Sequence, residues 1–184
     1  ILPAPENSFY CIDEAHHLPK KALSQFAAEH SWNQAVWTLE KLPAISDKIA
    51  AVADKAEAAN LADEAAASLL ESLNEWSFQL ADEPALAPSE GSESVWLWQD
   101  GEIPASLELL VSNTAVAARS LLKQLYTLND ALAATRRDKD QDSALIDRLR
   151  GEFGMFIARA EQISAVWDLL STVPPAGEAP LAKW

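Results

Sequence analysis

The chain has 184 residues and a formal net charge of −14, and 49% of its residues are hydrophobic. This composition excludes a disordered chain, and the length is enough for one domain with a sizeable core. The acidic balance argues against a domain that binds nucleic acid on its own, because affinity for phosphates comes mainly from Lys and Arg. No apolar run approaches the roughly 18 residues that span a bilayer, and no signal peptide is visible. We therefore expect a piece of a longer cytoplasmic protein without membrane contact.

The first predicted element is a short buried strand at residues 9–12, with the sequence Phe-Tyr-Cys-Ile. It follows a Pro-rich loop and runs directly into Asp13 and Glu14. A buried parallel strand delivers carboxylates in this way at its C-terminal end, where P-loop NTPases hold the magnesium of the nucleotide. With the two residues that follow, the acids form the sequence Asp-Glu-Ala-His, a DEAH box. The alternative is a strand-to-helix turn that ends in surface acids.

The residues around the box carry a family resemblance. The box continues with His17-Leu18-Pro19, and the stretch ILP-PEN-FY-IDEAHHLPKKAL resembles the DinG branch of the XPD-like, superfamily-two DNA helicases. The close match covers about residues 1–25, and the remainder resembles the family in its layout. The resemblance implies an ATP-dependent DNA helicase. It also implies that a long helical insertion, the arch domain, interrupts the first motor domain and helps to enclose the translocating DNA strand.

The resemblance also implies roles for the residues of the box. Asp13 and Glu14 would hold Mg2+, Glu14 would also position and deprotonate the attacking water, and His16 would link the γ-phosphate to the partner motor domain. For His17 a site role and an exposed polar residue both stay open. ATP binding needs a Gly-x-x-x-x-Gly-Lys-Ser/Thr loop, and none occurs in the 184 residues, so we expect no activity from this chain alone.

The cysteine content bears on a further cofactor of that family. Cys11 is the single cysteine, so it cannot form an internal disulfide or hold a metal cluster by itself. The resembled family often carries an iron–sulfur cluster bound by four cysteines. Such cysteines would lie upstream of the box, outside this chain. Cys11 itself is typical of a small buried strand residue.

Helices are predicted over most of the remaining chain. One is expected from Pro19 to about Glu29, a second over residues 32–42 with Val36, Trp37 and Leu42 in the core, and a long one over residues 43–81 that Asn60 breaks into two. Pro19 suits the first turn of the first of these helices, and Pro43 opens the long one. The apolar positions of this stretch are spaced in steps of three and four, as in a coiled coil: Ile45, Ile49, Val52, Ala56, Ala59, Ala66, Leu70 and Leu73.

Residues 82–102 are predicted to form a loop, since they include two Pro, two Gly and six acids without Lys or Arg. Trp96 and Trp98 lie inside it. Two tryptophans in a loop suggest a base-stacking site. The missing cations favour the alternative, in which the tryptophans fill a gap in the helical bundle.

Two long helices are predicted at residues 104–135 and 142–172. Apolar positions again follow in steps of three and four, which indicates an antiparallel pair of helices about 45 Å long at 1.5 Å per residue. Gly151 and Gly154 weaken the second helix and suggest a kink or a close helix contact. The expected fold class is therefore all-α, a long antiparallel bundle with a short terminal strand. The expected seams are Val111, Thr114, Ala118, Leu121, Leu125, Leu128 and Leu132, and Ile146, Leu149, Phe153, Phe156, Ala160, Ile163, Trp167 and Leu170.

Three divisions follow: residues 1–18 belong to the motor domain, residues 19–172 form the arch-like insertion, and residues 173–184 return to the motor domain. DNA would be the partner of the whole helicase. Any contact from this chain is expected at its densest basic stretch, formed by Arg136, Arg137, Lys139, Arg148 and Arg150. The alternative is a solvated turn, because four nearby aspartates nearly cancel these charges.

Two further expectations concern association. An apolar strand at residues 9–12 without its sheet neighbours tends to recruit another chain, so we expect the isolated chain to self-associate as a dimer. The alternative function is a non-enzymatic acidic helical adaptor in which the box is coincidental. The two functions differ in geometry: termini that lie close together favour an insertion, and termini at opposite ends of the bundle favour the adaptor.

Overall fold

The computed structural model describes residues 15–17, 27–81, 98, 102–135 and 143–173. It contains a short 3-10 helix, η2 (Ala15–His17), followed by four long α-helices: α2 (Trp32–Ala53), α3 (Ala56–Ala81), α4 (Glu108–Thr135) and α5 (Ser143–Ser171). These described residues contain no strand. The all-α prediction is therefore confirmed, while the strand predicted at residues 9–12 lies outside the described residues.

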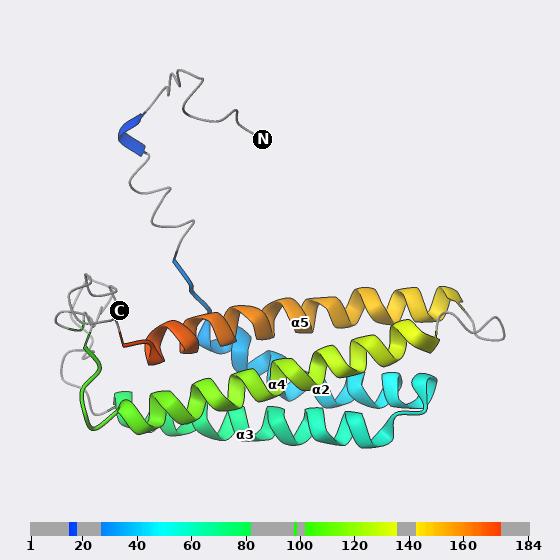
Figure 1. Ribbon diagram of the computed structural model, residues 1–184, viewed down its shortest axis with the longest axis horizontal. Helices are drawn as coiled ribbons and strands as arrows, with labels where there is room; N and C mark the ends of the chain where they lie inside the picture. Colours follow the sequence, from blue (N-terminus) through cyan, green and yellow to red (C-terminus); the bar gives the residue numbers. More distant parts are fainter. Residues whose placement is uncertain (1–14, 18–26, 82–97, 99–101, 136–142, 174–184) are drawn as a thin grey trace.

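The four α-helices form one antiparallel bundle in an up-down-up-down arrangement (Figure 1). Each helix packs against the next along the chain, and α5 also packs against α2, which closes the ring. Because the number of helices is even, the chain leaves α5 at the end where it entered α2. We call this end the base, and we call the opposite end, with the α2–α3 turn, the end of α4 and the start of α5, the tip.

The core of the bundle follows the predicted seams closely on α4 and α5. All seven predicted positions of α4 are buried, and seven of the eight on α5 are buried, with Leu170 half-buried at the base. Steps of three and four keep one face of a helix turned toward its neighbours, so a single apolar stripe on each helix meets the others. The largest fully buried side chains include Phe153, Leu125 and Leu128.

The start and end of α2 differ from the prediction. Residues 27–31 are not helical, so no helix extends to Glu29, and α2 runs from Trp32 straight through Pro43. An interior Pro costs roughly 3 kcal/mol through a lost hydrogen bond and a ring clash. Burial of Leu39, Leu42 and Ile45 on both sides of the exposed Pro43 offsets that cost.

The break between α2 and α3 lies at Asp54 and not at Asn60. Asp54 has a left-handed backbone (φ 52°, ψ 50°), and the next amide, of Lys55, donates to the Ala50 carbonyl at 3.2 Å. This is a Schellman ending, and Asp tolerates the left-handed region better than most residues. Asn60 stays within α3, because its intrinsic helix penalty is small against burial of the apolar face.

Two core predictions on α2 are wrong. Trp37 is 45% exposed and Val36 is half-buried, whereas Leu42 is buried as expected. The buried positions of α2 lie on one stripe that includes Leu39, Ile45 and Ile49. Trp37 falls outside that stripe because it lies two residues before Leu39, about 200° around the helix.

The glycines of α5 make no close helix contact. A Cβ added at Gly151 or Gly154 would meet no atom within 4 Å, and neither residue has a positive φ. We therefore expect Gly151→Ala and Gly154→Ala each to raise the free energy of unfolding by up to about 1 kcal/mol, since Ala is the better helix former. Urea unfolding followed by circular dichroism measures this effect. A loss of stability in both variants would show that the backbone at these two positions requires glycine.

Candidate functional site

Only the second half of the DEAH box lies among the described residues. Asp13 and Glu14 lie outside them, and His16 and His17 lie on η2 with both side chains exposed. Their ring centroids are 3.9 Å apart, with the planes tilted by 41°. The roles of Asp13, Glu14 and His16 therefore stay predictions.

The predicted DNA contacts that the structure describes do not form one cluster. Arg136, Arg137 and Lys139 lie outside the described residues, whereas Arg148 and Arg150 lie near the start of α5. Residues two apart on a helix do not share a face, so the two arginines point in different directions. Arg148 is exposed, and its Nε lies 3.1 Å from Glu152 Oε1. Arg150 is half-buried, and its Nε is buried without a hydrogen-bond partner among the described residues.

Aromatic side chains join the helices at the base of the bundle. The ring of Trp167 on α5 lies 5.2 Å from the ring of Trp76 on α3 and 6.2 Å from the imidazole of His30, just before α2. Trp76 Nε1 donates to Thr114 Oγ1 at 3.1 Å, and this hydroxyl donates to the Leu110 carbonyl at 2.7 Å. The segment that enters the bundle is thus held against the last turns of the helix that leaves it.

The loop tryptophans were predicted to fill a gap in the bundle or to stack on bases. Trp98 is half-buried and packs against the hydrophobic core, together with Ile103. This position agrees with the gap-filling prediction for Trp98. Trp96 lies outside the described residues.

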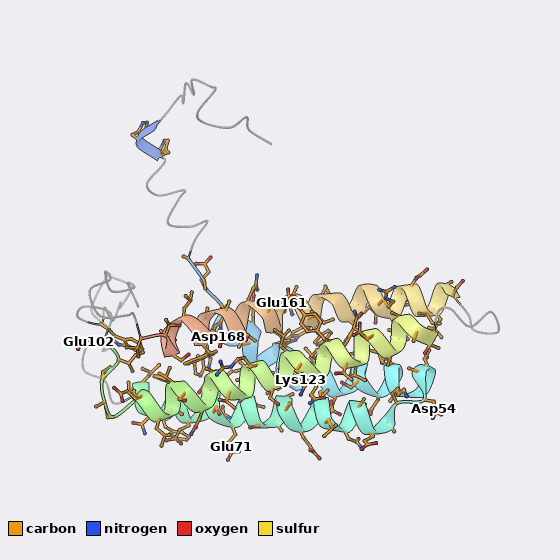
Figure 2. All side chains as sticks on the ribbon, in the orientation of Figure 1. Asp54, Glu71, Glu102, Lys123, Glu161 and Asp168 are labelled. Carbon is orange, nitrogen blue, oxygen red and sulfur yellow. The ribbon has the colours of Figure 1, made fainter. Side chains whose placement is uncertain are left out.

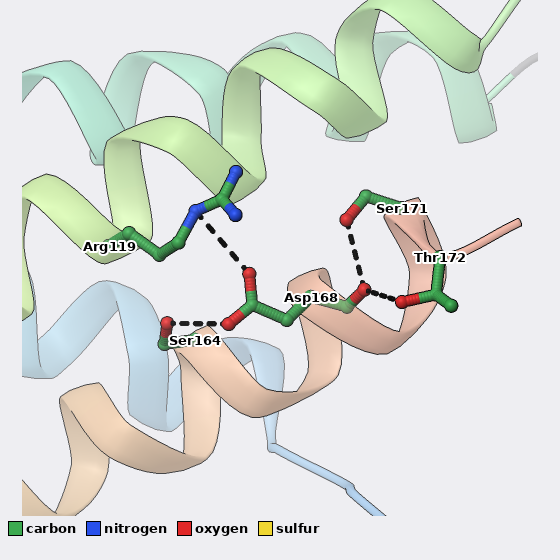
Figure 3. Close-up of polar contacts among 5 residues, drawn as sticks. All are labelled: Arg119, Ser164, Asp168, Ser171 and Thr172. Carbon is green, nitrogen blue, oxygen red and sulfur yellow. Dashed lines mark hydrogen bonds and ion pairs between the residues drawn. The ribbon is translucent and has the colours of Figure 1, made fainter.

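An ion pair and three hydroxyl contacts converge on Asp168 near the end of α5 (Figure 3). Arg119 Nε of α4 lies 3.5 Å from Asp168 Oδ1, and Ser164 Oγ lies 3.4 Å from Oδ2. The hydroxyls of Ser171 and Thr172 donate to the Asp168 carbonyl at 2.9 and 2.7 Å. Both charged side chains are about half exposed, so the ion pair contributes little to stability. The contacts instead close the last turn of α5, where its carbonyls lack helical partners.

The sequence did not reveal this group or the His30 contact. The hydroxyl residues after Asp168 are a visible signal for a helix end. The pairing of Arg119 with Asp168 depends on how α4 and α5 are aligned, which the spacing within each helix does not specify. Figure 2 labels Asp168 on α5 and Lys123 on α4.

Burial lowers the pKa of His30 below its ordinary value, and a backbone hydrogen bond at Ser31 opposes this shift in part. A lowered pKa in the folded state means that the unfolded chain takes up the proton first as the pH falls. We therefore expect the contribution of His30 to stability to be complete above about pH 6.5 and to be lost as the pH falls below it. Thermal unfolding of the native chain and of His30→Gln between pH 7.5 and 5 measures this. An equal pH slope in both proteins would contradict the expectation.

Within the described ranges, no group of three or more His, Cys, Asp or Glu side chains is placed to hold a metal ion. No described helix combines the length and the apolar character that crossing a membrane requires. The predicted metal ligands Asp13 and Glu14 lie outside these ranges.

The features above define a class: an acidic, closed four-helix bundle that the chain enters and leaves at one end. Over all 184 residues the chain is 31% identical to the ATP-dependent DNA helicase DinG of Photobacterium profundum. It spans 26% of the length of that relative. The predicted resemblance to DinG-type helicases is therefore confirmed, and it extends beyond residues 1–25 through the whole bundle. No family model matches the chain. No solved structure is significantly similar to it.

Proposed function

We propose that this chain is one part of a longer ATP-dependent DNA helicase of DinG type, which couples ATP hydrolysis to translocation on a single strand and to unwinding. The observation that carries the proposal is the similarity over the entire chain to a protein named as such a helicase. A bundle joined by chance to a DEAH-like sequence would not match one helicase continuously across both parts. The chain spans about a quarter of that relative, so the remaining motor segments would lie outside it.

In the proposed helicase, residues 1–18 supply the DEAH turn of the first motor domain. Asp13 and Glu14 would hold Mg2+, since carboxylate oxygens are the ligands that this ion prefers. Bound Mg2+ would neutralise charge on the phosphates of ATP. Glu14 would orient and deprotonate the attacking water, and His16 would transmit the state of the γ-phosphate to the second motor domain. A phosphate-binding loop and any cysteines for an iron–sulfur cluster would come from elsewhere in the helicase.

Residues 19–172 would form the arch-like insertion, and residues 173–184 would return to the motor domain. Support comes from the base of the bundle, where His30 before α2 contacts Trp167 near the end of α5. An insertion must return the chain close to its starting point, and a closed four-helix ring does so. A non-enzymatic adaptor would not need its chain to enter and leave the bundle at the same end. The acidic parts of the bundle surface would repel DNA and help to keep the strand in its channel.

Unwinding by the full-length helicase tests the proposal. We expect the full-length protein to displace a labelled strand from a partial duplex with ATP and Mg2+, and the isolated 184-residue chain to show no ATP hydrolysis with or without DNA. Light scattering on residues 1–184 and 19–184 tests the proposed dimer of the isolated chain. A full-length protein that neither hydrolyses ATP nor unwinds DNA would leave the adaptor as the better function.

A further inference from the structure

An exposed tryptophan is held in place where α2 meets α5. Trp37 is 45% exposed, and its ring stacks on Phe156 of α5 with centroids 6.3 Å apart and planes 16° apart. The guanidinium carbon of Arg159 lies 5.0 Å from the Trp37 ring centroid, and Arg159 Nη1 lies 3.4 Å from Thr38 Oγ1. The indole is therefore fixed in orientation while much of its surface faces solvent.

Cations continue from this tryptophan toward the tip on both helices. Lys41 and Lys48 lie four and eleven residues after Trp37, spacings that keep all three on one side of α2. On α5, Arg148 lies eleven residues before Arg159, so it shares the side of α5 that faces α2. We call the surface formed by Trp37, Lys41, Lys48, Arg148 and Arg159 the α2–α5 face.

The charge of this face is opposite to that of the chain, which carries a net charge of −14. The face holds four cations, and Glu152 lies among them and pairs with Arg148. Glu40 and Asp47 of α2 lie roughly 60–80° around that helix from Trp37, on the neighbouring side. The other described cations lie elsewhere, in the α2–α3 turn, on α4 and two residues from Arg148: Lys55, Arg119, Lys123 and Arg150.

A purely structural role explains only part of the arrangement. Cation–π contact and ring stacking secure α2 against α5, which accounts for Trp37 and Arg159. It does not account for the exposed Lys41 and Lys48. Arg148 is also exposed, and its pairing with Glu152 lies within α5 and does not secure α2. A row of cations beside a partly open aromatic ring is what a single-stranded nucleic acid needs, with cations for phosphates and an aromatic surface for a base.

We propose that the α2–α5 face binds single-stranded DNA, with backbone phosphates on Lys41, Lys48 and Arg148 and a base against the open part of Trp37. The eleven-residue spacing spans about 16 Å along the helices, enough for a few nucleotides. The inference rests on the proposed helicase function and assigns a DNA contact to the bundle. It also places that contact between two helices and away from Arg150, which lies on another side of α5.

The test uses the full-length helicase and a labelled oligo-dT strand. Lys41→Glu with Lys48→Glu is compared with a control of equal charge change on other surfaces, Lys55→Glu with Lys123→Glu. We expect the α2–α5 variant to lose at least about tenfold in affinity at moderate salt, with the slope of log K against log salt reduced by about 1.4 for two lost phosphate contacts. The control should stay within about twofold of wild type.

A second variant tests the aromatic part. Trp37→Leu should lower the affinity for the same strand about fivefold or more, because a stacking contact is lost. The slope of log K against log salt should change little. Unfolding temperatures of all variants close to wild type show that the bundle is intact. If both variants bind the strand as tightly as wild type and the wild-type protein unwinds DNA, the proposed DNA site is wrong and the proposed helicase function stands. The α2–α5 face would then be better explained as a surface that binds a protein partner. A wild-type protein that binds no DNA would overturn the proposed function as well.

Discussion

Glu14→Gln in the full-length helicase is expected to lower ATP hydrolysis at least about 100-fold while nucleotide binding persists. The amide keeps the size of the side chain but cannot accept the proton of the attacking water, and loss of a general base typically costs about 10²- to 10⁴-fold. Binding persists because it depends on phosphate contacts made elsewhere and on the Mg2+ that Asp13 would hold. Steady-state hydrolysis and equilibrium binding of a fluorescent ATP analogue measure the two quantities separately.

A matched control for this variant comes from the bundle. Glu57→Gln makes the same change in the first turn of α3, where the side chain is exposed. It should leave hydrolysis within about twofold of wild type, because it lies outside the DEAH turn. Hydrolysis that persists in Glu14→Gln would remove Glu14 from the general-base role. Loss of both binding and hydrolysis would instead show that nucleotide binding depends on the Mg2+ contact of Glu14 and not on Asp13 alone.

Trp76→Ala is expected to lower the free energy of unfolding of the chain by about 3–5 kcal/mol. Trp76 is 2% exposed, so the substitution removes a large buried ring and leaves a cavity beside Trp167. It also removes the donor that satisfies Thr114 Oγ1, although that hydroxyl keeps its bond to the Leu110 carbonyl. Chemical unfolding followed by circular dichroism in the far ultraviolet measures the loss.

The control for Trp76 lies two residues further along α3. Phe78 is 74% exposed, so Phe78→Ala should change stability by no more than about 0.5 kcal/mol. A comparable loss in both variants would show that the base of the bundle depends on helix composition and not on the buried ring. Trp76→Phe should lose less than Trp76→Ala, because most of the apolar volume is kept.

Several features could be predicted because they are local. The three-four spacing of Val111, Leu121 and Leu128 is a property of one helix, and an apolar stripe of that period predicts which side is buried. The DEAH sequence and its continuation through Pro19 are contiguous, so the residues alone carry the resemblance to DinG-type helicases. The comparison over the whole chain agrees with it.

Helix boundaries were harder to predict from the sequence, because tertiary burial outweighs local preferences. Pro43 is a strong local signal for a helix start, yet it lies inside α2, since the apolar stripe on both sides is buried by α3 and α5. Asp54 is a weak signal for a helix end, and only its left-handed backbone shows that α2 stops there. Trp37 is large and apolar, but its position around α2 leaves it partly open beside Arg159.

The sequence by itself determined the helical class, the buried stripes of α4 and α5 and the likeness to a helicase, because each depends on spacing or identity along one stretch of chain. Only the tertiary structure decided which residues meet across helices. It pairs Arg119 with Asp168, brings His30 against Trp167 at the base and stacks Trp37 of α2 on Phe156 of α5. These contacts depend on the order and vertical alignment of four helices. Many alignments bury the same apolar stripes, so the stripes alone do not select one.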